Sequence, residues 1–124
     1  MRAHILTMAF VFIALPAIAK DIEPVKIPAA EQSVISSDTF NGAKLGNYEA
    51  AISGCGGYIA NEELYNATLR KYENSISGFS ASGKSRAMHV RAAGYKASSD
   101  SIHDDTAGFD WCAMMAEDGI LMRP

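Results

Sequence analysis

The chain has 124 residues, of which 48% are hydrophobic, and 11 Lys and Arg against 14 Asp and Glu give it a net charge of −3 at pH 7. A chain of this length forms one domain and is too short for two. The mildly acidic balance, without a basic stripe interleaved with aromatic residues, argues against nucleic-acid binding.

The first nineteen residues have the pattern of a secretory signal peptide. A basic start that contains Arg2 precedes an apolar run over 5–15, and residues 17–19 read A-I-A, a typical cleavage site. We therefore expect cleavage between Ala19 and Lys20 and a periplasmic or secreted product. The apolar run is shorter than the roughly 20 residues that span a bilayer, and we expect no membrane span in the mature chain.

Residues 20–42 differ in character from the rest of the chain. Pro24 and Pro28 interrupt this stretch, and its apolar residues follow no helical period. We predict an extended or flexible arm over 20–42, followed by a helical domain over 43–124.

The first helix of that domain is predicted from Leu45, because apolar residues recur there at intervals of three and four. Glycines surround Cys55 and disfavour a helix interior, so the helix should end or bend there. Asn61 is a suitable N-cap for a second helix, whose first turn carries Glu62 and Glu63 at the positive end of the helix dipole.

Two more helices are predicted from the remaining pattern. The third begins at position 82 or 85 and ends near 97, and a polar linker follows over 98–101. The last helix would be capped by Asp104 or Asp105 and would stop at Gly119.

Cys55 and Cys112 are the two cysteines of the chain, and an even pair in a small exported domain favours a disulfide. Closing the loop between them would stabilise the fold by about 4 kcal/mol on the chain-entropy model. Two free thiols in a metal or redox site are the alternative, but the chain has no C-x-x-C spacing. The predicted fold class is mainly α, a small three- or four-helix domain closed by one disulfide and preceded by an extended N-terminal arm.

Residues 78–85 read GFSASGKS and match the G-x-x-x-x-G-K-S pattern of phosphate-binding loops. Such a loop follows a buried strand, whereas residues 72–77 continue a helix and are too polar for one. We interpret the match as chance. The functional alternative is an anion-binding turn at a helix N-terminus, formed by Gly83, Lys84 and Ser85.

Two groups of residues invite a metal hypothesis. His103 and the acids around it could bind a divalent cation, but they lack the ligand alternation of calcium loops, and helix capping is the simpler interpretation. Met114, Met115 and Met122 lie near Cys112 in sequence, and sulfur ligands select copper(I). Filling gaps in a helical core explains the methionines more simply. We expect no metal and no cofactor.

The chain shows no serine or cysteine nucleophile recognisably paired with a base and no arrangement of carboxylates typical of glycoside cleavage, so we do not expect an enzyme. Small exported helical proteins with two cysteines include periplasmic acid-stress chaperones and immunity proteins that neutralise effectors from rival cells. The stretch 55–59, CGGYI, resembles a Cys-x-Gly-Tyr-Ile segment of the immunity proteins. The likeness covers five residues and lacks that family's second nearby cysteine, so it assigns no family.

The function that these observations favour is non-catalytic binding of another periplasmic or secreted protein, as an inhibitor, an immunity factor or an accessory subunit. Tyrosine is enriched at interfaces, and five tyrosines form the candidate interface. They are Tyr48, Tyr58, Tyr65, Tyr72 and Tyr95. Rings that close the core with their hydroxyls at its edge are the alternative. A periplasmic acid-stress chaperone is the second hypothesis, a carrier of copper is the third, and the oligomeric state stays open.

Overall fold

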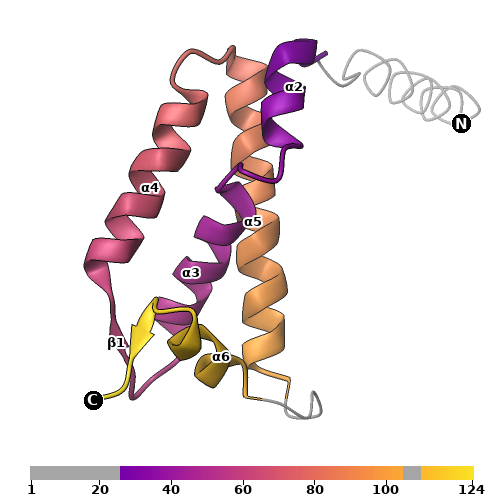
Figure 1. Ribbon diagram of the computed structural model, residues 1–124. Helices are drawn as coiled ribbons and strands as arrows, with labels where there is room; N and C mark the ends of the chain where they lie inside the picture. The colour runs from indigo at the N-terminus through magenta and orange to yellow at the C-terminus, as the bar shows by residue number, and fades with distance from the viewer. Residues whose placement is uncertain (1–25, 105–109) are drawn as a thin grey trace, which may run out of the picture.

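The computed structural model describes residues 26–104 and 110–124 (Figure 1). Within these ranges the chain forms five helices and a ribbon of two short strands. In chain order they are α2 (Ala29–Ile35), α3 (Gly42–Gly54), β1 (Ile59–Ala60), α4 (Glu62–Ile76), α5 (Ala81–Ile102), α6 (Trp111–Glu117) and β2 (Leu121–Met122). The predicted mainly α fold is confirmed, with five helices in the described ranges instead of three or four.

The signal peptide and its cleavage site at Ala19 and Lys20 lie outside the described residues. Over 26–104 and 110–124, no helix is both long enough and apolar enough to cross a bilayer.

Part of the predicted extended arm is a helix. α2 begins directly after Pro28, which is its N-cap residue. Proline breaks a helix interior but is tolerated at a helix start, where the first N–H groups have no helical partner. Ala29 and Ala30 then favour helix, and Ile35 at the other end is buried in the core. The prediction was wrong for this segment because the proline marks a start and not a break.

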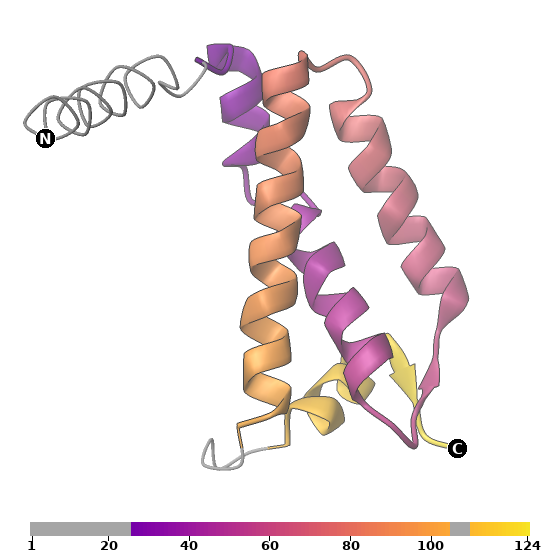
Figure 2. The same cartoon turned by 180° about the vertical axis from the view of Figure 1, so that it is seen from behind.

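The central pair of the fold is α3 and α5, which lie side by side (Figures 1 and 2). Two glycines let their backbones meet. A Cβ on Gly46 would lie 2.0 Å from the carbonyl oxygen of Arg91, and a Cβ on Gly94 would lie 2.3 Å from that of Ala43. Real Cβ atoms do not approach other atoms so closely, so any larger residue would force the helices apart.

A buried polar contact lies beside the glycine crossing. The side-chain amide of Asn47 in α3 lies 2.7 Å from the hydroxyl oxygen of Ser98 in α5, and with its nitrogen facing α5 it also donates to the carbonyl oxygen of Gly94. Ser98 is only 2% exposed. The linker predicted over 98–101 is therefore wrong, because α5 continues to Ile102 and a polar residue in it is buried against Asn47.

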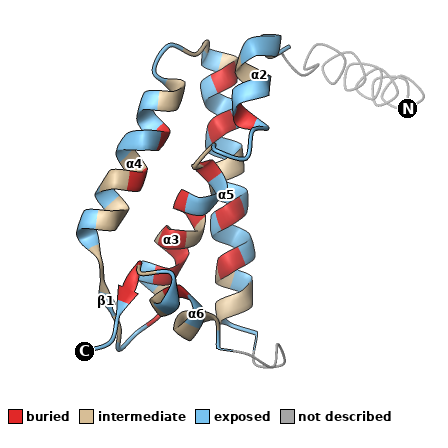
Figure 3. Ribbon diagram, in the orientation of Figure 1, coloured by how far each residue is buried: buried red, intermediate tan, exposed pale blue. Residues whose placement is uncertain are grey.

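Buried side chains gather on α3 and on the elements packed against it (Figure 3). One cluster surrounds the disulfide, and the other lies toward α2 and the C-terminal half of α4. The first contains Tyr48, Ala51, Cys55, Met115, Ile120 and Leu121, and the second contains Ile35, Leu45, Tyr72 and Ala87.

The predicted disulfide is confirmed. Cys55 directly follows α3, Cys112 lies in α6, and their Cα atoms are 5.7 Å apart. The bond therefore holds the last helix against the end of α3.

The predicted cap of α4 is also confirmed. The Asn61 side-chain oxygen accepts a hydrogen bond from the Leu64 N–H at 3.1 Å, and its amide nitrogen donates to the Gly119 carbonyl oxygen at 2.9 Å. Asn61 thus caps α4 and also anchors the C-terminal segment, whose β2 pairs antiparallel with β1.

The predicted cap of the last helix is wrong. α6 begins at Trp111, and the carboxylate of Asp110 accepts hydrogen bonds from the N–H groups of Cys112 and Ala113. Asp104 lies just after α5, and Asp105 lies outside the described residues. Gly119, with φ +91°, follows α6 as predicted.

Replacing Gly94 tests the crossing of α3 and α5. We expect Gly94→Ala to lower the free energy of unfolding by about 1–3 kcal/mol, because the new methyl group meets the backbone of α3. Gly78→Ala is the control, since no neighbouring atom lies within 4 Å of a Cβ there. Urea denaturation of both variants measures the difference, and equal stabilities would contradict the role assigned to the crossing.

Candidate functional site

The side chain of Glu49 joins three helices at one point. From α3 it accepts hydrogen bonds from Arg91 Nε of α5 at 2.9 Å and from the Tyr65 hydroxyl of α4 at 2.8 Å. Arg91 Nη2 donates to the same carboxylate. The side chains of Arg91 and Glu49 are 30% and 24% exposed, so this ion pair is partly shielded from water.

The charges at this point are fixed near neutral pH. The hydrogen bond from Arg91 holds the pKa of Glu49 below its ordinary value of 4.5, against the opposing effect of burial. Burial and the hydrogen bond to Glu49 raise the pKa of Tyr65 above 10.0. The bond to Glu49 likewise raises the pKa of Arg91. Glu49 and Arg91 are therefore ionised, and Tyr65 keeps its proton.

Arg91 also packs on an aromatic ring. Its guanidinium carbon lies 5.2 Å from the ring centroid of Tyr72, which is 2% exposed. Such a contact attracts a cation to the ring face and restricts the guanidinium to one orientation.

Two hollows meet at Glu49, and we call them together the Glu49 groove. The first, of about 320 Å³, is lined from α3, β1 and α4. The second, of about 300 Å³, is lined from α3 and α5. Besides Glu49, the first is lined by Ile52, Ala60, Glu62 and Tyr65, and the second by Met88, Arg91, Ala92 and Tyr95.

Three large apolar side chains of the Glu49 groove are exposed to solvent. Ile52 is 37% exposed, Tyr95 is 41% exposed and Met88 is 61% exposed. The Tyr95 hydroxyl lies 3.2 Å from the Ser53 hydroxyl, which ties this ring to α3. Single exposed apolar residues are ordinary on proteins, whereas several around one groove are typical of a contact surface.

The five tyrosines of the candidate interface fall into different environments. Tyr48 and Tyr72 are 3% and 2% exposed and belong to the core, so their rings are not accessible to a partner. Tyr65 lines the first hollow of the Glu49 groove and Tyr95 lines the second. Tyr58 packs on the disulfide cluster and lines neither hollow.

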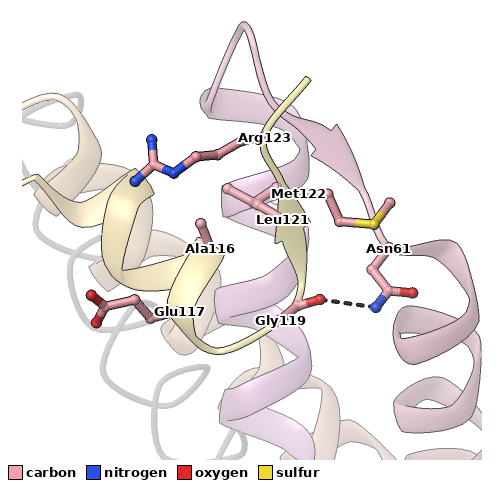
Figure 4. Close-up of a pocket in the computed structure, with 7 residues that line it drawn as sticks. All are labelled: Asn61, Ala116, Glu117, Gly119, Leu121, Met122 and Arg123. Atoms are coloured by element: carbon pink, nitrogen blue, oxygen red, sulfur yellow. Dashed lines mark hydrogen bonds between the residues drawn. The ribbon is translucent and has the colours of Figure 1, made fainter.

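A larger hollow of about 500 Å³ lies near the C-terminus (Figure 4). Its Asn61 amide nitrogen donates to the Gly119 carbonyl oxygen, while the amide oxygen caps α4. Arg123, which also lines this hollow, lies with its Nη1 3.4 Å from the Tyr58 hydroxyl. Asn61 and Arg123 therefore already have partners within the chain, and no aromatic residue of the described ranges lines this hollow.

The phosphate-loop match has a structural explanation. The carboxylate of Glu31 in α2 accepts hydrogen bonds from the N–H of Ser80 at 2.9 Å and from its hydroxyl at 2.7 Å. Ser80 caps α5, and a Cβ on Gly83 would lie 2.0 Å from Glu31 Oε1. The N–H groups of Gly83 and Lys84 are bonded to Ser80, the carboxylate of Glu31 lies beside Ser80 and Gly83, and α4 instead of a strand precedes the loop.

The metal hypotheses concern His103 with its neighbouring acids and the methionines near Cys112. In the described ranges, no three His, Cys, Asp or Glu side chains are placed to hold a metal ion. Cys112 is in the disulfide and Met115 is 5% exposed in the core. Met114 and Met122 are 43% and 45% exposed.

The fold and the groove define a small helical domain, closed by a disulfide, with a partly buried ion pair at the centre of an apolar groove. No protein-family model matches the chain, and neither a curated protein nor a solved structure shows significant similarity to it. The function is therefore argued from the groove itself.

Sequence analysis overlooked Glu49 and the role of Arg91. Each is a charged residue on an otherwise apolar helix face, with Glu49 three residues before Ile52 and Arg91 between Met88 and Tyr95. A charged residue on an apolar helix face is the sequence signal that could have identified Glu49 and Arg91 as site residues. The pairing itself joins residues far apart in sequence and needs the helix crossing to be known.

Replacing Glu49 tests the electrostatic link between the three helices. Because folding lowers the pKa of Glu49, its contribution to stability is complete above the ordinary value of 4.5 and is lost as the pH falls through the lowered value. We expect Glu49→Gln to lower the free energy of unfolding at pH 7 by about 1–3 kcal/mol and to flatten its decline at acidic pH.

Urea denaturation between pH 7 and pH 3 measures both effects. Glu73→Gln is the control, because Glu73 is an exposed acid on α4. Parallel pH profiles for the wild type and Glu49→Gln would show that Glu49 does not link the helices.

Proposed function

We propose that this protein is exported and acts without catalysis, by binding another protein through the Glu49 groove. The observation that carries the proposal is the composition of the groove. Tyrosine, methionine and arginine are the residue types enriched in protein interfaces, and three helices present them around adjoining hollows.

The energetics of this groove favour association. Burial of apolar surface contributes about 25 cal/mol per Å², and Ile52, Met88 and Tyr95 have such surface left to bury. The close backbone packing of α3 on α5 already fixes two walls of the groove. A preformed surface loses less conformational entropy on binding than a flexible one.

The ionisation of the groove supports recognition over catalysis. A general acid or base works best with a pKa near the operating pH. The pKa of Glu49 is lowered away from neutral pH, and the pKa of Tyr65 is raised away from it. Both groups therefore keep one protonation state near neutral pH and serve as fixed hydrogen-bonding partners.

Export is supported by two features. The first nineteen residues match a signal peptide, and Cys55 and Cys112 are joined in a disulfide. Disulfides persist in oxidising compartments such as the periplasm and the cell exterior. A partner would accordingly be an envelope protein or a secreted protein.

Affinity capture tests the proposed function. The exported chain, recovered from the envelope with its disulfide intact, should capture one partner in stoichiometric amount from an envelope extract. Ile52→Lys should reduce capture at least about tenfold, because a charge replaces an apolar contact in the first hollow of the groove.

Val34→Lys is the matched control, since Val34 on α2 is 38% exposed against 37% for Ile52. Circular dichroism checks that both variants are folded. Absence of any stoichiometric partner, or equal losses in both variants, would contradict binding through the Glu49 groove.

One observation favours the acid-stress chaperone as a second candidate. Protonation of Glu49 would remove its charge, which abolishes the ion pair with Arg91 and weakens the hydrogen bond from Tyr65, and would so loosen the hold of α3 on α4 and α5. Exposure of apolar surface in acid is the property that such a chaperone needs.

This second candidate predicts binding of a hydrophobic dye at acidic pH and none at pH 7. It further predicts that Glu49→Gln binds the dye at a higher pH than the wild type, because its groove lacks the carboxylate from the outset. Fluorescence titration from pH 7 to pH 3 decides the matter. An unchanged signal in both proteins would exclude the acid-stress role.

A further inference from the structure

The hollow between α3 and α4 combines apolar walls with two carboxylates. Ile52, Ala60 and Tyr65 provide apolar surface, Glu62 provides an exposed negative charge, and Glu49 provides a carboxylate that is paired with Arg91. From this combination we infer that the hollow receives a lysine or arginine side chain of the partner protein. The inference rests on the proposed function and specifies the chemistry of the partner.

Long cationic side chains have the matching chemistry. Lysine and arginine have an apolar stem that packs along hydrophobic surface and a charged end that stays with polar groups. In this hollow, of about 320 Å³, the stem would lie against Ile52 and the Tyr65 ring. The charged end would pair with the carboxylate of Glu62.

Both carboxylates have capacity for a further hydrogen bond. Glu62 is exposed in the first turn of α4, and among the described residues none forms an ion pair or hydrogen bond with its carboxylate. Glu49 Oε1 accepts a hydrogen bond from Arg91 Nε, and a carboxylate oxygen has room for two. A guanidinium or ammonium group in this hollow therefore finds a carboxylate without an ion-pair partner in Glu62 and a further acceptor site on Glu49.

A purely apolar or acidic partner group fits this hollow poorly. Covering carboxylates with apolar surface removes their water without a replacement, and an acid would be repelled. A cation replaces the lost hydration with charge-assisted hydrogen bonds.

The second hollow has the opposite preference. Glu62 does not line it, its carboxylate from Glu49 is already paired with Arg91, and the exposed side chains of Met88 and Tyr95 provide apolar surface. The partner surface that fits the whole groove therefore carries a basic side chain beside an apolar one.

The experiment uses a defined probe, a displayed library of random dodecapeptides selected against the exported chain with its disulfide intact. We expect the enriched peptides to pair a lysine or arginine with an apolar residue. The selected peptides should bind the Glu62→Lys variant about tenfold or more weakly than they bind the wild type. Replacing the basic residue of a peptide by norleucine should weaken its binding to the wild type by a similar factor.

Glu63→Lys is the matched control. Glu63 follows Glu62 in the same exposed first turn of α4 and has the same relation to the helix dipole, but it does not line the hollow. We expect its affinity for the peptides to stay within about twofold of the wild type. Enriched peptides without a basic residue, or equal losses in the two variants, would overturn the inference.

The captured partner separates the two proposals. One outcome is a partner that fails to bind Ile52→Lys but binds Glu62→Lys as tightly as the wild type. That outcome would support protein binding through the groove and would contradict the inference that a basic side chain of the partner enters the first hollow. Failure to capture any partner would remove the proposed function itself.

Discussion

The close approach of α3 and α5 is the constraint on which the rest of the molecule depends. It requires Gly46 and Gly94, because a Cβ at either position would overlap the backbone of the opposite helix. The carbonyl group that faces Gly46 belongs to Arg91, and Glu49 lies one helical turn after Gly46 on α3. The close approach at the two glycines therefore also places Glu49 opposite Arg91. A wider crossing would separate the two charges and leave each partly buried without its partner, which costs free energy.

The remaining elements are attached around this pair of helices. The Cys55–Cys112 disulfide holds α6 at the end of α3, and Asn61 connects the start of α4 to the C-terminal segment. The Tyr65 hydroxyl ties α4 to Glu49. α4 is thus fixed at its N-terminal end by the cap and further along by a charged hydrogen bond. The space that it leaves beside α3 and α5 is the Glu49 groove, so the same contacts that stabilise the fold also shape its candidate binding face.

Features encoded by local chemistry could be predicted from the sequence. The cysteine count predicts the disulfide, the apolar spacing predicts α3, and Asn61 is recognisable as a cap. Features set by tertiary contacts could not. Pro28 starts a helix that is kept in place by burial of Ile35, and Ser98 continues a helix because it is buried against Asn47.

The candidate site divides in the same way. Tyr65 and Tyr95 were identified from residue type alone, whereas the link between Glu49 and Arg91 arises from the helix crossing. Hydrogen–deuterium exchange of the disulfide-bonded chain, with and without its captured partner, is the most direct test of binding through the Glu49 groove. If the partner binds in this groove, exchange becomes slower in the second half of α3, in the middle of α5 and in the first turns of α4. Protection confined to α2 or to the C-terminal segment would contradict it.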